Sequence, residues 1–177
     1  MNTSETSFLR GKKVLVAGGA GLLGVNLTRY LLEQGVEVLS TYYSRTPPED
    51  LRRCYQRFDF CNFVDCLKAT KGCDIVIICA IQAYGVQGMT QGPTSSILPN
   101  LNLQAGLLEA CSRNEVEKTM WISSSTVYQE AFYPIREDQL DLNQPPYNVY
   151  QGVAWVYRYI EQLARCYSEE MGTPVEV

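Results

Sequence analysis

The chain alternates short apolar runs with segments whose apolar residues recur every three or four positions. The first run covers 13–17 and ends in glycines, and leucines then recur at helical spacing up to Gly35. This pattern predicts a strand, a tight turn and a helix. The same criteria predict further strands at 36–42, 55–58, 74–80, 118–123 and 174–177, and further helices at 63–70, 97–113 and 149–171.

The arrangement of these elements predicts the fold. The unbroken apolar run over 74–80 is typical of a strand buried on both faces of a parallel sheet. Strands that alternate with helices indicate right-handed βαβ units, so we expect an α/β protein with a doubly wound parallel sheet in the order 3-2-1-4-5. One Rossmann domain would cover 1–177, with 1–11 as a loose polar lead-in and loops at 84–96 and 129–147.

Composition and charge exclude several classes of function. The sequence of 177 residues contains no histidine, which removes Ser-His-Asp and Cys-His triads and histidine-ligated metal sites. A net charge of −4 argues against nucleic acid as a partner. The longest apolar run, from Ile75 to Ile81, is far too short for the ~20 residues of a membrane span. Seven cysteines without a CxxC pair suggest reduced thiols in a cytoplasmic protein, and we expect no metal site.

A glycine-rich turn joins the first strand to its helix, with glycines at Gly18, Gly19, Gly21 and Gly24. In such a turn one glycine makes the tight bend, another lets the backbone approach a pyrophosphate, and a third lets the helix pack closely on the sheet. The helix begins around Leu22 and Leu23, where free N–H groups and a partial positive charge face the phosphates. The turn therefore predicts a dinucleotide site.

The end of the second strand bears on which dinucleotide is bound. NAD-binding domains usually place a carboxylate about 20 residues after the turn, to bind the ribose 2′-hydroxyl. This chain has the hydroxyl-rich segment Ser40-Thr41-Tyr42-Tyr43-Ser44 followed by Arg45. Hydroxyls and an arginine suit a 2′-phosphate better, which favours NADP over NAD. The alternative is that Arg45 is a solvated loop residue.

Four further segments follow in a fixed order: Phe58-Asp59-Phe60, Ile78-Cys79-Ala80-Ile81-Gln82, Asn100 to Ala110, and Trp121-Ile122-Ser123-Ser124-Ser125-Thr126-Val127-Tyr128. Together with the glycine turn they resemble the extended short-chain dehydrogenase/reductase family, the NAD(P)-dependent epimerases and dehydratases of nucleotide sugars. The resemblance implies that Asp59 and Phe60 lie at the adenine and that Ala80 and Ile81 pass beneath the cofactor. It also implies that Asn100 is a structural asparagine and that Ser124 is the catalytic serine.

In this family a Tyr-x-x-x-Lys pair on the last helix moves the proton. Aligning the segments Glu161-Gln162-Leu163 and Gly172-Thr173-Pro174 with the family places Val153 at the tyrosine and Tyr157 at the lysine. No other register restores the pair, because Lys118 is the last lysine of the chain. Ser124 and Tyr157 therefore remain the catalytic candidates, with Tyr150 a distant third.

The resemblance also implies a C-terminal substrate domain that this sequence does not contain. The chain ends as the strand at 174–177 begins, so we expect an open sheet edge beside the strand at 118–123. A piece of a longer protein, a natural short form and a split protein are alternative explanations for the short length.

The leading hypothesis for the function is the NAD(P)-binding portion of an epimerase/dehydratase-like oxidoreductase that acts on a nucleotide sugar. The alternative is an inactive NAD(P)-binding or protein-interaction module, or one half of a split enzyme. The resemblance further implies a homodimer through the last helix.

Overall fold

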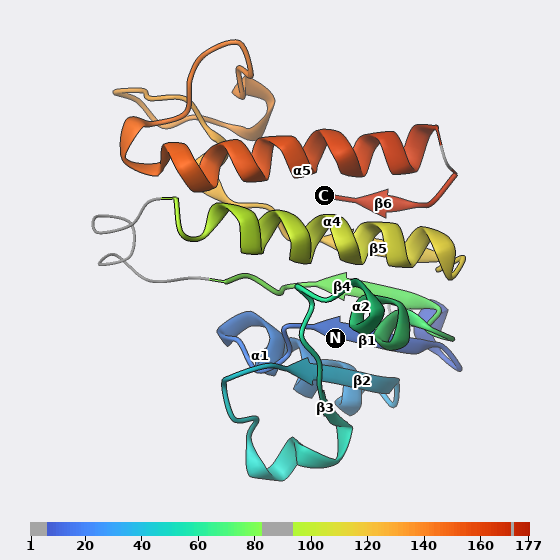
Figure 1. The fold of residues 1–177 in the computed structure, drawn as a ribbon. Coiled ribbons are helices and arrows are strands. Elements are labelled where there is room, and N and C mark those ends of the chain that lie inside the picture. Colours follow the sequence, from blue (N-terminus) through green and yellow to red (C-terminus); the bar gives the residue numbers. More distant parts are fainter. Residues whose placement is uncertain (1–6, 83–93, 171) are drawn as a thin grey trace.

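A single parallel sheet forms the centre of the molecule, in a computed structural model that describes residues 7–82, 94–170 and 172–177 (Figure 1). Its strands are β1 (Lys13–Ala17), β2 (Glu37–Tyr42), β3 (Tyr55–Arg57), β4 (Ile75–Ile78), β5 (Lys118–Trp121) and β6 (Val175–Glu176). They lie in the order β3-β2-β1-β4-β5-β6, and every pair of neighbours is parallel. The predicted Rossmann topology is confirmed and is extended by a sixth strand.

The sixth strand corrects the expectation of an open edge beside β5. Helix α5 (Gln151–Glu169) leads the chain back to the sheet, where Val175 pairs with Thr119. The Thr119 amide donates to the Pro174 carbonyl at 2.8 Å, and Lys118 forms an ion pair with Glu176 at 2.7 Å. Two residues of extended backbone are enough to cover this edge of β5 in part.

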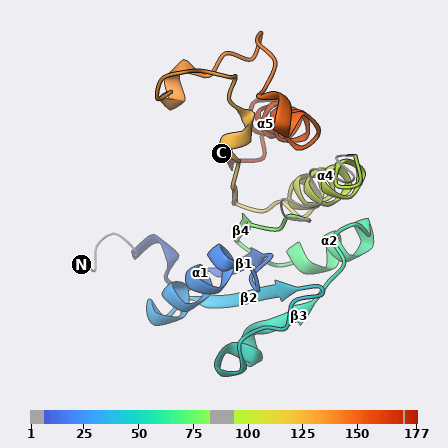
Figure 2. The same ribbon diagram turned by 90° about the vertical axis from the view of Figure 1, so that its left-hand side faces the viewer.

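The helices lie on both faces of the sheet (Figure 2). Helix α1 (Leu22–Glu33) covers one face, while α2 (Phe63–Thr70), α4 (Ile97–Arg113) and α5 cover the other. This division follows from topology. A right-handed connection places its helix on one face of the sheet when the chain moves toward β3, and on the other face when the chain moves toward β6.

Alternation along the strands builds two cores. Val14 and Val16 of β1 pack with Leu31 and neighbours on the α1 side, whereas Leu15 and Ala17 pack in the larger core beneath α2, α4 and α5. All four of these β1 side chains are fully buried. The apolar run of β4 is likewise buried throughout, as a central parallel strand requires.

Some expected loops are different in the structure. Residues Glu49–Cys54, between β2 and β3, form a 3-10 helix, with Asp50 in an ion pair with Arg29 of α1 at 2.8 Å. Within the expected lead-in, Ser7–Leu9 forms a 3-10 turn and Leu9 is buried in the core on the α1 side. The rest of that lead-in up to residue 6, and the part of the expected 84–96 loop up to residue 93, lie outside the described residues.

Candidate functional site

The glycine turn after β1 is packed so closely that a Cβ would clash at three of its positions, Gly18, Gly19 and Gly24. Gly18 has φ +83°, and a Cβ there would lie 2.6 Å from the Ala80 Cα. A Cβ on Gly24 would lie 2.5 Å from the Gly18 carbonyl oxygen. The first turn of α1 can therefore pack directly on the bend, as the sequence pattern predicts.

Thr41 of β2 holds this turn in place. Its Oγ1 accepts the Gly18 amide at 2.9 Å, and its carbonyl accepts the Ala20 amide at 3.2 Å. From β3, the Tyr55 hydroxyl donates to the Gly19 carbonyl at 2.8 Å. These contacts preorganise the bend. Neither Thr41 nor Tyr55 was assigned this role from sequence, because no local pattern marks a side chain that reaches the turn from another strand.

The N-terminus of α1 opens from this turn toward solvent. Gly21 is the N-cap residue and supplies no side-chain hydrogen bond. Leu22 and Leu23 are 84% and 49% exposed, an unusual setting for two leucines. The first amides of a helix have no partner within the helix and carry a partial positive charge. Together, the close glycine bend, the uncapped amides and the exposed leucines fit a dinucleotide pyrophosphate.

The expectation that the hydroxyls at the carboxyl end of β2 suit a 2′-phosphate is wrong for Ser40 and Thr41. The Ser40 and Thr41 hydroxyls are turned inward, since Ser40 bonds to Thr28 at 2.8 Å and Thr41 is engaged with the turn. Both side chains are buried because these positions of β2 face α1 and β1. Arg45 is exposed. A second arginine lies nearby: Arg57 Nε donates to the Tyr43 carbonyl at 3.1 Å, and its guanidinium is 5.2 Å from the centre of the Tyr43 ring.

The remaining residues implied at the cofactor follow the ends of β3 and β4. Asp59 is partly exposed, with one carboxylate oxygen accepting the Cys61 amide at 3.0 Å. Phe60 is buried and stacks with Phe58. Beyond β4, Ala80 borders Gly18 and Ile81 is 44% exposed. Carboxyl ends of parallel strands meet at one edge of a sheet, so these residues follow strands that end at the same edge as the glycine turn.

Asn100 fixes the segment that follows β4. This fully buried side chain accepts the Gln82 amide at 2.9 Å and donates to the Gln82 carbonyl at 3.0 Å and the Ser96 carbonyl at 2.8 Å. Asn100 thus satisfies both backbone groups of Gln82, as the resemblance to the family implied for a structural asparagine.

The serine turn after β5 borders a cavity of about 870 Å³, whose lining includes Ser123, Ser124, Tyr128, Glu137 and Glu161. Ser124 Oγ accepts the Thr126 amide at 3.3 Å and the Thr126 hydroxyl at 3.0 Å. Ser123 donates to the Glu161 carboxylate of α5. Both serine hydroxyls are therefore engaged within the turn or with α5.

Tyr157 lies in the core beneath α5 and not in this cavity. It is 5% exposed and packs against Trp121, with the ring centres 5.4 Å apart. Burial raises the pKa of its hydroxyl to about 12, partly offset by a hydrogen bond with Gln104. Val153 packs against the same core. In the described part of the chain, no hydrogen bond joins Tyr157 to Ser124, so the role of Tyr157 in proton transfer stays a prediction that these surroundings disfavour.

Arg158 is the functional candidate that sequence reasoning missed. This residue follows Tyr157 on α5 and is only 3% exposed, which no local pattern in the sequence indicates. Its Nε donates to the Val127 carbonyl at 2.7 Å and its Nη1 to the Gln144 carbonyl at 2.6 Å. The guanidinium also lies 5.1 Å from the centre of the Trp155 ring. Burial lowers the pKa of this side chain, but an arginine stays charged at neutral pH.

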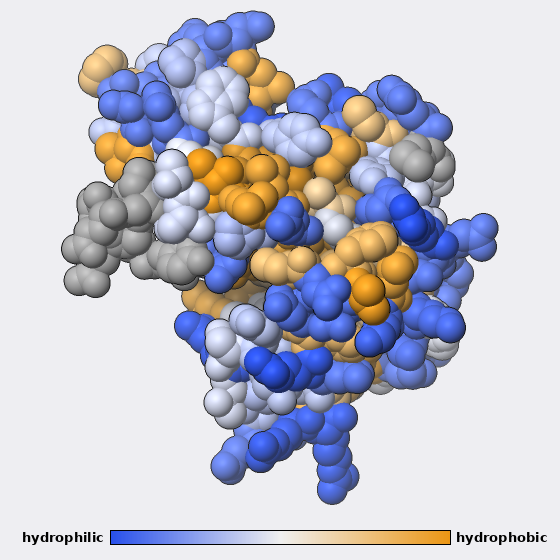
Figure 3. Space-filling model, in the orientation of Figure 1, coloured by the Kyte–Doolittle hydropathy of each residue, from blue (hydrophilic) through white to orange (hydrophobic). Residues whose placement is uncertain are grey.

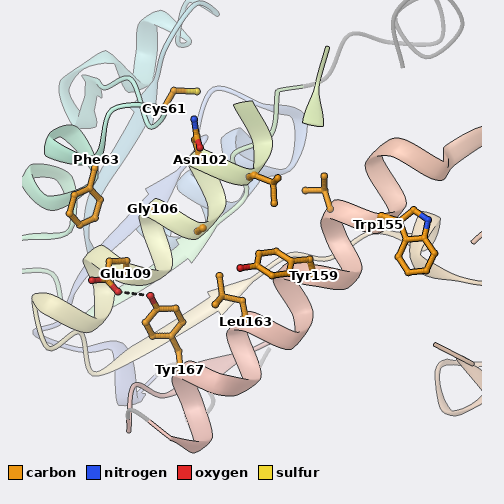
Figure 4. Close-up of a pocket in the computed structure, with 12 residues that line it drawn as sticks. Cys61, Phe63, Asn102, Gly106, Glu109, Trp155, Tyr159, Leu163 and Tyr167 are labelled. Atoms are coloured by element: carbon orange, nitrogen blue, oxygen red, sulfur yellow. Dashed lines mark hydrogen bonds between the residues drawn. The ribbon is translucent and has the colours of Figure 1, made fainter. Parts of the chain in front are cut away.

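A groove of about 870 Å³ runs between α4 and α5 on the outer face of the helical layer (Figure 4). Trp155 and Tyr159, both about half exposed, line it together with Leu163. Tyr167 crosses the groove and donates to the Glu109 carboxylate, which also pairs with Arg113 at 2.6 Å. Apolar surface gathers over this region of the two helices (Figure 3).

The fold and the glycine turn are typical of Rossmann-type dinucleotide-binding proteins. The model of the NAD dependent epimerase/dehydratase family matches residues 14–175, and the chain belongs to this family. GDP-L-fucose synthase from Dictyostelium discoideum is 26% identical over 162 residues, which cover 91% of this chain and 48% of that protein. The chain spans half or less of the length of the curated relatives it matches.

Solved structures agree on the fold. GDP-mannoheptose C4 reductase from Campylobacter jejuni with NADP bound superposes with a TM-score of 0.77 at 18% identity, over 99% of this chain and 50% of that one. UDP-glucose 4-epimerase from Thermus thermophilus in complex with NAD gives 0.75 at 24% identity, over 92% and 53%. Within the described residues, the helices are too short or too polar to cross a bilayer.

Proposed function

We propose that the chain is the NAD(P)-binding portion of an oxidoreductase of the epimerase/dehydratase type that acts on a nucleotide sugar. The observation that carries this proposal is the glycine bend, held by Thr41, beneath the uncapped and exposed start of α1. Gly18, Gly21 and Gly24 with the amides of Leu22 and Leu23 would hold the pyrophosphate. Bound there, the dinucleotide would supply hydride transfer.

Support for a nucleotide sugar comes from relatives. GDP-L-fucose synthases and a UDP-glucose 4-epimerase are similar to this chain, although over only about half of their own length. The sugar itself would lie in the cavity beside the serine turn, which Ser124 and Tyr128 line.

We further propose that NADP is preferred over NAD. Support comes from two exposed arginines. Arg45 follows the end of β2, and Arg57 is the last residue of β3. Arg57 is already held against Tyr43, so little side-chain entropy would be lost when it meets a phosphate.

Calorimetric titration with NADPH and NADH tests both statements. We expect saturable binding of NADPH, and a weaker Kd for Leu22→Glu because a carboxylate would repel the pyrophosphate. Tyr30→Glu, an exposed position two turns further along α1, is the matched control. Arg45→Ala and Arg57→Ala should weaken NADPH binding and leave NADH binding unchanged. Absence of saturable binding by the parent chain would refute the proposal.

A second candidate function, an NAD(P)-binding module without catalysis, is favoured by the burial of Tyr157 and by Val153 at the expected tyrosine position. A valine exchanges no proton, and a buried phenol with a pKa of about 12 stays protonated near neutral pH. Hydride transfer by this chain alone, with a nucleotide sugar as substrate, would exclude this alternative.

The groove between α4 and α5 supports a homodimer as the assembly of the chain. Half-exposed Trp155 and Tyr159 provide apolar anchors of the kind that concentrate binding energy in interfaces. Sedimentation of the parent and of Trp155→Glu tests this: we expect a dimer that the substitution dissociates, with Tyr133→Glu, an exposed aromatic of the 129–147 loop, as control. A parent chain that is monomeric at high concentration would refute it.

A further inference from the structure

The segment from 128 to 147 leaves the serine turn, projects from the body of the molecule and returns to the start of α5 (Figure 1). We call it the projecting loop. Its base is closed by a bridge between Gln129 and Pro146 and by the Tyr147 amide, which donates to the Tyr128 carbonyl at 3.4 Å. These closing contacts are few, so something else must fix the direction in which the loop leaves the protein.

Inside the loop, the backbone is held by its own side chains. Gln129 Nε2 donates to the Gln139 carbonyl at 2.9 Å, and Gln129 Oε1 accepts the Asp141 amide at 3.1 Å. Asp141 in turn accepts the Asn143 amide at 2.9 Å. The loop is therefore an ordered unit whose placement depends on its attachment.

Arg158 provides that attachment from α5. One nitrogen of its guanidinium binds the carbonyl of Val127, just before the loop, and another binds the carbonyl of Gln144, near its end. The two acceptors belong to segments 31 and 14 residues away from Arg158 in sequence. A planar guanidinium with fixed donor directions can hold two carbonyls at once, which a lysine ammonium on a flexible stem does less precisely.

The burial of this charge indicates that the contact is maintained. Arg158 is 3% exposed, and none of its nitrogens lies within 4.0 Å of a carboxylate oxygen among the described residues. Glu161 and Asp141 favour the charged form from a greater distance. A desolvated charge without a carboxylate in direct contact is costly, so its hydrogen bonds to the two carbonyls are needed to compensate.

We infer that Arg158 is a positioning residue: by holding both ends of the projecting loop, it sets where the loop and the preceding serine turn lie at the carboxyl edge of the sheet. Val127 ends the 3-10 turn capped by Ser124, so a shift of the Val127 carbonyl shifts that turn. The effect on a bound dinucleotide rests on the proposed function, whereas the effect on the loop does not.

The first test is hydrogen exchange of the loop amides in Arg158→Lys and Arg158→Met. Because hydrogen bonds from a charged donor are stronger than neutral ones, the Tyr147 and Asp141 amides should exchange between about 10-fold and 100-fold faster. Amides of β1 and β4 should keep their protection. Arg165→Met, an exposed arginine two turns further along α5, is the matched control. Unchanged loop exchange in either variant, or faster exchange spread evenly over the sheet, would overturn the inference.

A second variant keeps the test valid if the substitutions at Arg158 prevent folding. Gln129→Ala loosens the loop from its own side and leaves Arg158 in place. In this variant and in Arg158→Lys, the emission of bound NADPH should change while its Kd stays within about twofold, because the glycine turn is untouched. Altered loop exchange with unchanged emission would refute the positioning role. If the parent chain binds no NADPH, the proposed function fails and the exchange measurement alone decides the role of Arg158.

Discussion

Tyr157 of α5 packs its ring against Trp121 of β5, with ring centres 5.4 Å apart and planes inclined by 35°. This contact occupies the position at which relatives are expected to carry the lysine of the catalytic pair. An aromatic pair of this kind contributes beyond its buried area, and both side chains are almost fully inaccessible. The surroundings of Tyr157 are those of a core residue.

Alkaline titration should reveal this burial. Burial raises the pKa of the Tyr157 hydroxyl from its ordinary value of 10.0 to about 12, so unfolding releases a proton between these pH values. Stability due to this group is therefore present below pH 10 and falls as the pH rises toward 12. The loss amounts to about 2–3 kcal/mol. Between pH 9 and pH 11, urea unfolding should show a loss of stability that is about 1.4 kcal/mol larger in the parent than in Tyr157→Phe.

The control for that measurement is Tyr159→Phe. Tyr159 is 54% exposed, so the variant should keep the full slope of the parent. The buried thiols of Cys66 and Cys111, whose pKa values burial raises to about 12, contribute equally to every chain compared. A parent and a Tyr157→Phe variant with equal slopes would show that Tyr157 is not buried in solution.

A lysine introduced at position 157 should destabilise the fold. Tyr157→Lys would place an ammonium group against Trp121 without a carboxylate partner, at a cost of about 3 kcal/mol or more. Tyr159→Lys, at an exposed site two residues further along, should cost less than about 0.5 kcal/mol. Urea unfolding at neutral pH measures both. Equal stabilities would mean that position 157 reaches solvent, as a catalytic lysine must.

Asn100 should contribute strongly to stability, because one side chain satisfies three backbone groups. In Asn100→Ala the Gln82 amide and the Gln82 carbonyl lose their partner, whereas the Ser96 carbonyl still accepts the backbone amide of residue 100; the two unpaired groups should lower the free energy of unfolding by about 2–4 kcal/mol. Asn102→Ala, an exposed position on α4, is the matched control. An effect of the same size in both variants would contradict this contribution of Asn100 to stability.

The regular elements could be predicted from sequence because local patterns determine them. Helix α2 begins and ends as predicted, since Asn62 caps it by accepting the Val64 amide at 3.0 Å. The β1 turn is specified by glycines whose packing excludes a Cβ. In contrast, a strand was predicted at 174–177 but its place beside β5 was not, because β6 pairs with a strand more than 50 residues earlier and local patterns do not indicate that partner.

The site was less predictable because the direction of a side chain depends on tertiary contacts. Sequence showed hydroxyls at Ser40 and Thr41 but not that both point into the protein. It showed Arg158 beside Tyr157 but not the two carbonyls that the loop brings to it. Spacing along one element predicts which residues share a face. It does not predict which distant backbone groups meet them.

Thr41 offers the most direct test of the preorganised glycine turn. Thr41→Val keeps the shape of the side chain but removes the acceptor of the Gly18 amide, which should lower stability by about 1–3 kcal/mol. Thr41→Ser keeps the hydroxyl and should restore most of this loss. If the hydrogen bond also shapes the phosphate site, Thr41→Val should weaken NADPH binding by about tenfold, equivalent to about 1.4 kcal/mol, while Thr41→Ser binds like the parent. Calorimetry on the three chains decides the matter: a Thr41→Val variant that loses stability but binds NADPH normally would show that the turn forms its phosphate site without Thr41.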